Sequence, residues 1–166
     1  CGPDLIDRVM ADSANSGLRH YLYGGKPGVA DQLRKVFEGS YEGVQIVGTS
    51  TPPFRDLTDQ ELAELAEHLR TQCADVVWIG LSTPKQEFLM RRLAPLVPAT
   101  LIGVGAAFDF HTGHVRRAPR WMQRTGLEFL FRFVNEPKRL WRRYLVMAPR
   151  FVLLILSELS RQPRRL

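Results

Sequence analysis

The feature that most constrains the fold is a set of short apolar runs that alternate with helical patterns. The run Asp75–Leu81 is almost continuously apolar, and Thr100–Gly105 is a second run of this kind. Strands that are apolar on both faces are typical of parallel sheets covered by helices. Two further strands are predicted at His20–Tyr23 and Val44–Val47. Together these runs indicate an α/β fold with a mostly parallel sheet.

The segments between the predicted strands carry helix signals. Pro27 suits the first turn of a helix whose apolar stripe continues to Phe37. Thr58 and Glu61 have the spacing of a capping box, which opens a second helix. A third helix is predicted over Pro84–Leu93. Because each helix joins two successive strands, we expect a Rossmann-like sheet flanked by helices.

Composition and charge divide the chain into two parts. Apolar residues make up 45% and charged residues 24%, which argues against disorder and against a membrane-spanning bundle. Residues 1–115 carry 10 Lys and Arg against 14 Asp and Glu, whereas residues 116–166 carry 13 against 3. From residue 119 to about 160 the pattern is helical only. We therefore expect an α/β body at 1–115 and a basic, amphipathic helical appendage at 116–166.

The predicted appendage combines arginines with aromatic residues. Its candidate binding residues are Arg117, Arg120, Arg132, Arg139, Arg142, Arg143 and Trp141. Arg139, Arg142 and Arg143 are three and four residues apart, so they share one face of a helix. Guanidinium groups bind phosphate oxygens in pairs, so this face suits a pyrophosphate, while Trp141 suits a membrane interface. A solvated basic surface is the alternative.

Three strand ends hold residues suited to a ligand, because ligands of open parallel sheets bind beyond the carboxyl ends of the strands. The first consists of Gly24, Gly25 and Lys26. Glycines let a backbone approach a ligand closely, and the start of a helix favours phosphate. An ordinary turn is the alternative, and the segment matches neither the Walker nor the dinucleotide-binding pattern.

The second strand end leads from Gly80 through small and polar residues into the helix predicted at Pro84. Lys85 offers a positive charge for phosphate. Gln86 offers both a donor and an acceptor, which suits a nucleobase or a sugar hydroxyl, and Glu87 follows it. The alternative is a helix start whose side chains are merely solvated.

The third strand end runs from Gly105 to Asp109, which stands between Phe108 and Phe110. An acid in such a position suits ribose hydroxyls or the role of a general base. Capping of a turn is the alternative.

Metal and thiol chemistry have little support in the sequence. His111 and His114 are three residues apart, but a third ligand is not evident, so we expect no metal. Cys73 stands beside a predicted buried strand and is expected to be a buried core thiol. We also expect no cofactor.

Four motifs stand in order along the chain: Gly80–Glu87, Gly103–Phe110, Arg117–Glu128 and Asn135–Tyr144. As a set they resemble the WecG/TagA/CpsF family of bacterial glycosyltransferases, which is glycosyltransferase family 26. The resemblance extends from Gly2 to about Leu156, nearly the whole chain.

The resemblance implies inverting transfer of a sugar from a UDP-sugar to an acceptor on undecaprenyl pyrophosphate. The sugar would be N-acetylmannosamine, its uronic acid, glucose or glucuronic acid. The product would feed wall teichoic acid, enterobacterial common antigen, capsule or exopolysaccharide. The family's location implies a cytoplasmic protein, peripheral on the inner face of the bacterial cytoplasmic membrane. A nucleic-acid partner is not expected.

The resemblance also implies roles for individual residues. Gln86 matches a family residue near the substrate, so it is a candidate catalytic residue. Arg132, Arg139 and Arg142 match arginines that would meet the acceptor's pyrophosphate or the departing UDP. The family's presumed catalytic base is an aspartate in a Pro-Asp-Gly segment, which these 166 residues do not contain. We therefore expect a fragment of a longer protein, with Asp109 as a substitute base.

Other interpretations remain open. The chain could be an inactive or partial nucleotide-binding α/β fragment, or a nucleic-acid-binding module that uses the basic, aromatic appendage. Self-association through open sheet edges is a further expectation.

Overall fold

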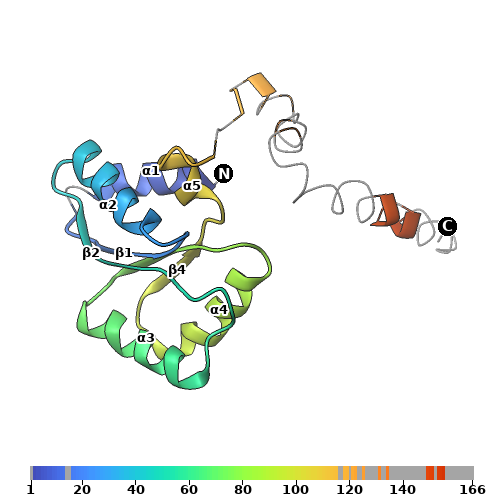
Figure 1. Ribbon diagram of the computed structural model, residues 1–166. Coiled ribbons are helices and arrows are strands. Elements are labelled where there is room, and N and C mark those ends of the chain that lie inside the picture. The colour runs from blue at the N-terminus through green and yellow to red at the C-terminus, as the bar shows by residue number, and fades with distance from the viewer. Residues whose placement is uncertain are drawn as a thin grey trace, which may run out of the picture. The chain divides into compact units, whose positions relative to one another are not determined.

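The computed structural model describes residues 2–13, 16–115, 118–119, 121–122, 125, 131, 134, 149–151 and 153–155. The chain divides into two compact units, Cys1–Arg116 and Arg117–Leu166. The helices and strands named below all belong to the first unit (Figure 1). The site residues predicted for the appendage lie outside the described residues: Arg117, Arg120, Arg132, Arg139, Trp141, Arg142 and Arg143.

Four strands form one sheet in which all neighbours are parallel. They are β1 (Arg19–Gly24), β2 (Gln45–Ser50), β3 (Val76–Gly80) and β4 (Thr100–Gly103). Their order across the sheet is β2-β1-β3-β4. This arrangement confirms the predicted α/β, Rossmann-like fold, since parallel strands need crossover helices between them.

The helices fall on both faces of the sheet (Figure 1). They are α1 (Gly2–Ser13), α2 (Val29–Ser40), α3 (Asp59–Thr71), α4 (Lys85–Leu93) and α5 (Ala107–His111), with a 3₁₀ turn, η1 (Ala94–Leu96), after α4. One face packs against α1, α2 and α5 through a core that includes Phe37 and Trp78. The other packs against α3 and α4 through a core that includes Leu69 and Val77.

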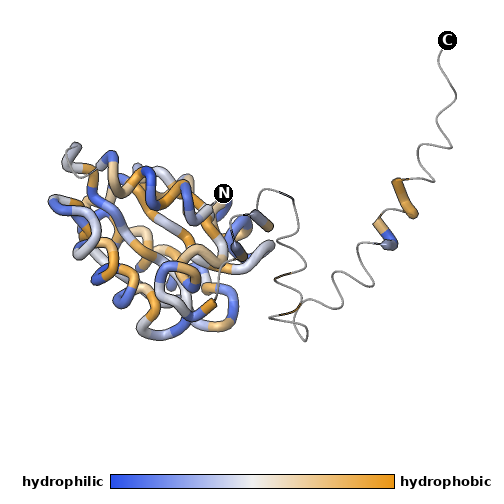
Figure 2. Tube along the Cα trace, turned by 90° about the horizontal axis from the view of Figure 1, so that it is seen from above, coloured by the Kyte–Doolittle hydropathy of each residue, from blue (hydrophilic) through white to orange (hydrophobic). Residues whose placement is uncertain are grey.

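The burial of the strands follows the hydropathy of the sequence. All five residues of β3 are buried, as its continuous apolar run predicts. The helices, by contrast, alternate between hydrophobic and hydrophilic residues along their length (Figure 2). Each helix therefore has one face for the core and one for solvent.

Two expectations about burial were wrong. In β4 Thr100 is exposed and the next three residues are half-buried, because β4 is an outer strand of the described sheet. Cys73 is exposed rather than buried. It lies in the turn before β3, with a φ angle of 50°. Because this turn precedes the buried strand, the Cys73 side chain reaches solvent.

A buried hydrogen-bonded chain connects α1, β1 and β3. The Trp78 indole N–H donates to Nδ1 of His20 at 3.2 Å. Since that nitrogen accepts, Nε2 of His20 carries the proton and donates to the Ser13 hydroxyl at 2.7 Å. The hydroxyl in turn donates to the Met10 carbonyl at 3.0 Å. This chain needs a neutral imidazole, and burial lowers the pKa of His20.

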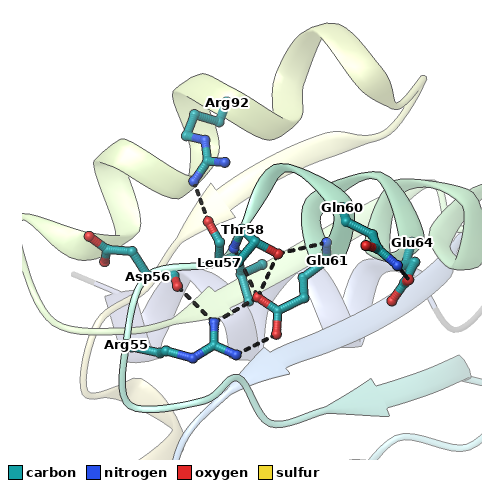
Figure 3. Close-up of polar contacts among 8 residues, drawn as sticks. All are labelled: Arg55, Asp56, Leu57, Thr58, Gln60, Glu61, Glu64 and Arg92. Atoms are coloured by element: carbon teal, nitrogen blue, oxygen red, sulfur yellow. Dashed lines mark hydrogen bonds and ion pairs between the residues drawn. The ribbon is translucent and has the colours of Figure 1, made fainter.

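The loop between β2 and α3 is held by the start of its own helix (Figure 3). The predicted capping box of Thr58 and Glu61 is confirmed, with the Glu61 N–H donating to the Thr58 hydroxyl at 3.2 Å. The Arg55 guanidinium donates to both carboxylate oxygens of Glu61, at 2.7 and 2.6 Å. Arg55 and then the Thr58 N–H lower the pKa of Glu61 to about 2. Arg92 of α4 donates to the Leu57 carbonyl at 2.8 Å, which joins this loop to α4.

Candidate functional site

The order of the strands defines where a ligand would bind. The chain leaves β1 through α2 towards β2 on one side, and leaves β3 through α4 towards β4 on the other. Helices α2 and α4 therefore start from neighbouring strands but cover opposite faces of the sheet (Figure 1). Ligands of such sheets bind at this reversal, beyond the carboxyl ends of the strands. We call the edge where the four strands end the carboxyl edge.

The structure brings the first two predicted segments together at the carboxyl edge. Gly24 of β1 pairs with Gly80 of β3, and the Gly25 N–H donates to the Gly80 carbonyl at 3.0 Å. A Cβ on Gly24 would lie 2.5 Å from that carbonyl oxygen, and a Cβ on Gly80 would lie 2.7 Å from the Phe108 ring. These glycines thus allow the strands and α5 to approach one another, a structural role that the sequence analysis did not assign to them.

The turn after β1 leads into α2 without a side-chain cap. Gly28 is the N-cap residue, has a φ angle of 84° and makes no side-chain cap bond. Lys26 is exposed in the same turn, and its carbonyl accepts from the Val29 N–H at 3.0 Å. Besides the bonded Val29 N–H, the N–H groups at the start of a helix favour an anion, and so does a neighbouring lysine.

Gln86 joins the start of α4 to the turn between β4 and α5. Its side-chain oxygen accepts from the Gly105 N–H at 3.1 Å, and its side-chain nitrogen donates to Glu87 at 3.0 Å. The Thr83 hydroxyl donates to the same Glu87 oxygen at 3.2 Å. The hydrogen bond from Gln86 is the largest influence that lowers the pKa of Glu87. Part of the hydrogen-bonding capacity predicted for a ligand is therefore used within the protein.

Lys85 and Pro84 lie at the same helix start. Pro84 is the N-cap residue of α4 and follows a cis peptide bond from Thr83. The exposed Lys85 ammonium donates to the Phe54 carbonyl at 3.0 Å, in the loop after β2. Lys85 therefore links the segment after β3 to the loop after β2, two strands that lie on either side of β1, and its charge stays at the carboxyl edge.

Asp109 lies in α5, on the α1 and α2 face of the sheet, and is half-buried. Its carbonyl accepts from the Val115 N–H at 3.1 Å. Within the described residues, the structure records no side-chain bond between Asp109 and the Gln86 and Glu87 pair. Asp109 thus lies on α5, whereas Lys85, Gln86 and Glu87 lie on α4.

The two histidines considered for metal binding have other neighbours. Nδ1 of His111 lies 3.6 Å from the Asp7 carboxylate, and its ring meets Phe37 edge-on at 5.3 Å. His114 faces the Thr112 hydroxyl at 2.8 Å. Over the part of the chain that the structure describes, three His, Cys, Asp or Glu side chains never gather as a metal site would require.

Two residues of this region were not singled out from the sequence. The Thr83 hydroxyl donates a hydrogen bond to the Glu87 carboxylate. The position of Thr83 in the polar run before α4 was the sequence signal that could have identified it. Phe108 packs against Gly80 and lies 3.7 Å from the position of a Cβ on Gly25. Its contact with two strand ends cannot be recognised from spacing, because those glycines lie far from it in sequence.

A comparison with known families assigns the chain. The model of the family described as Glycosyl transferase WecG/TagA/CpsF matches residues 1–165. The chain belongs to this family. Members of the WecG/TagA/CpsF family are glycosyltransferases of cell-surface polysaccharide synthesis, so the chain is a transferase with a sugar donor and a glycan acceptor. Among its described residues, no helix combines the length and the apolar character needed to cross a bilayer.

Proposed function

We propose that this protein is an inverting glycosyltransferase that moves a sugar from a UDP-sugar to an acceptor on undecaprenyl pyrophosphate. The observation that carries the proposal is the meeting of Gly24, Gly25 and Gly80 at the reversal point of a parallel sheet, in a member of this family. The sugar would be N-acetylmannosamine, its uronic acid, glucose or glucuronic acid.

The carboxyl edge offers groups for each part of the donor. The turn of Gly25 and Lys26 and the uncapped start of α2 would receive the diphosphate. Lys85 adds positive charge beside the loop after β2. Gln86, Glu87 and Gly105 would lie against the sugar or the nucleoside.

The reaction needs a base and a stabilised leaving group. A base takes the proton of the acceptor hydroxyl while its oxygen attacks the anomeric carbon and the bond to UDP breaks. Asp109 is our candidate for the base among the residues of this chain. Negative charge grows on the departing diphosphate, so arginines placed there would stabilise the transition state more than the ground state. Arg132, Arg139 and Arg142 are the candidates, together with Arg117, Arg120 and Arg143.

The basic appendage would bring the enzyme to its acceptor. A lipid pyrophosphate lies at a membrane surface, and clustered arginines beside Trp141 suit anionic headgroups. We therefore propose a peripheral location on the inner face of the bacterial cytoplasmic membrane, and self-association as a further property.

The test is a transfer assay with the full-length protein, the four UDP-sugars and a synthetic lipid pyrophosphate acceptor. Asp109→Asn is expected to lower kcat by about 100-fold or more, as loss of a general base does, while calorimetry shows unchanged UDP affinity. Asp12→Asn, on the exposed face of α1, is the matched control and should leave kcat unchanged.

Each outcome has a clear meaning. Full turnover in Asp109→Asn would assign the base to another residue. If the protein binds single-stranded nucleic acid but does not bind UDP, a nucleic-acid-binding module would be favoured instead. UDP uptake without turnover of any donor would favour an inactive nucleotide-binding protein.

A further inference from the structure

The amide of Gln86 is held on three sides by the protein. Its oxygen accepts from the Gly105 N–H, and its nitrogen donates to the Glu87 carboxylate. On the third side it lies against Gly103, where a Cβ would come within 3.0 Å of the amide carbon and nitrogen. The side chain is half-buried at the carboxyl edge.

These contacts allow only one orientation of the amide. A backbone N–H can only donate, so Gly105 requires the oxygen of Gln86 on its side. An ionised carboxylate can only accept, so Glu87 requires the nitrogen on the other side. A rotation by 180° would replace both attractive contacts by repulsive ones at the same time.

The Glu87 carboxylate is itself held in place by hydrogen bonds. The Thr83 hydroxyl donates to the oxygen that receives the Gln86 bond. These bonds, with that of its own backbone N–H, hold the pKa of Glu87 below its ordinary value. The carboxylate therefore stays ionised at neutral pH and remains an acceptor.

We propose that Glu87 is a positioning residue, which fixes Gln86 so that it meets the sugar donor with an N–H group and not with its carbonyl. This inference rests on the proposed function. An amide nitrogen carries two hydrogens, and the bond to Glu87 takes one of them. Gln86 then recognises an acceptor oxygen of the donor, such as a phosphate oxygen, a carboxylate or an acetamido carbonyl.

The first test needs no substrate. In the 1H–15N correlation spectrum of the full-length protein, the Gln86 side-chain proton that is donated to Glu87 should lie downfield of a free amide proton and exchange slowly with solvent. In Glu87→Ala the signal of this proton should approach that of a free amide. A free-amide pair in the unaltered protein would overturn the inference, whatever the protein does with UDP.

The second test uses kinetics with UDP-sugars. Glu87→Ala and Thr83→Val are expected to lower kcat/KM, the former on the order of tenfold or more, as removal of a charged hydrogen-bond partner does. Glu87→Gln should recover part of the loss, since its carbonyl can accept from Gln86. Thermal unfolding should change little, because Glu87 is exposed.

Glu64→Ala is the matched control. Gln60 of α3 donates to Glu64 at 3.0 Å, so this variant removes an amide–carboxylate bond of the same length that involves none of the predicted site residues (Figure 3). It should leave kcat/KM unchanged. Equal activity of Glu87→Ala and the unaltered enzyme would overturn the inference and leave the proposed function standing, whereas failure of the unaltered protein to bind UDP would contradict the proposed function.

Discussion

Gly24→Ala is expected to lower the free energy of unfolding by about 3 kcal/mol or more. The new Cβ would lie 2.5 to 2.8 Å from three backbone atoms of Gly80, on the neighbouring strand. Backbone atoms of a central strand cannot move aside as a flexible side chain can. The φ angle of Gly24, 143°, adds strain for any residue with a Cβ. Urea denaturation at neutral pH measures the effect.

Gly17→Ala separates the two causes. Gly17 also has a positive φ angle, 70°, but a Cβ there would meet nothing within 4 Å. This control is therefore expected to cost only about 1 kcal/mol, the strain of the backbone alone. Equal losses in the two variants would show that the contact between β1 and β3 is looser than we describe.

His20→Phe is expected to lower the free energy of unfolding by about 2 kcal/mol at neutral pH. The side chain of His20 is fully buried, and the substitution leaves the Trp78 N–H without an acceptor. In a Trp78→Phe background the loss on changing His20 should be smaller, because no donor is then left unpaired. Urea denaturation of the unaltered protein, the two single variants and the double variant measures the coupling free energy between His20 and Trp78.

The same histidine predicts a pH dependence. Burial lowers the pKa of His20 from 6.5, so below pH 6.5 the unfolded chain binds a proton that the folded protein excludes. Stability should therefore fall as pH decreases from 6.5, with a slope of at most about 1.4 kcal/mol per pH unit for this one group, until the folded protein takes up the proton. The pKa values of Glu61 and Asp75 are both lowered to about 2. Their contributions to the stability of the protein are therefore lost only at lower pH, as pH falls from about 4.5.

Denaturation at a series of pH values between about 5 and 7 measures this slope. His20→Phe should remove it, whereas His114→Gln, in an exposed position, should keep it. A slope that persists in His20→Phe would mean that another group takes up the proton on unfolding.

Much of the fold could be predicted because its signals are local. The apolar run of β3 and the capping box of α3 each depend on neighbouring residues, and both are confirmed. Helix α1 was not predicted, although Ile6 and Met10 have helical spacing and are buried.

The candidate site could be predicted less well, because its contacts are not local. The strand ends were located from hydropathy, but the pairing of Gly24 with Gly80 depends on the order of the strands. The bond from Gly105 to Gln86 spans 19 residues and depends on how β4 lies beside β3. Sequence spacing identified Gln86 as a polar group near a strand end, but could not show which of its atoms the protein already uses.

The measurement that tests the central claim most directly is amide chemical-shift mapping by 15N NMR, with UDP added to the full-length protein. The account predicts that the largest shifts fall at the carboxyl edge, on Gly25, the first turn of α2, Gly80–Glu87 and Gly105. Unchanged spectra at millimolar UDP, or shifts confined to the opposite edge around Arg19, Gln45 and Val76, would contradict it.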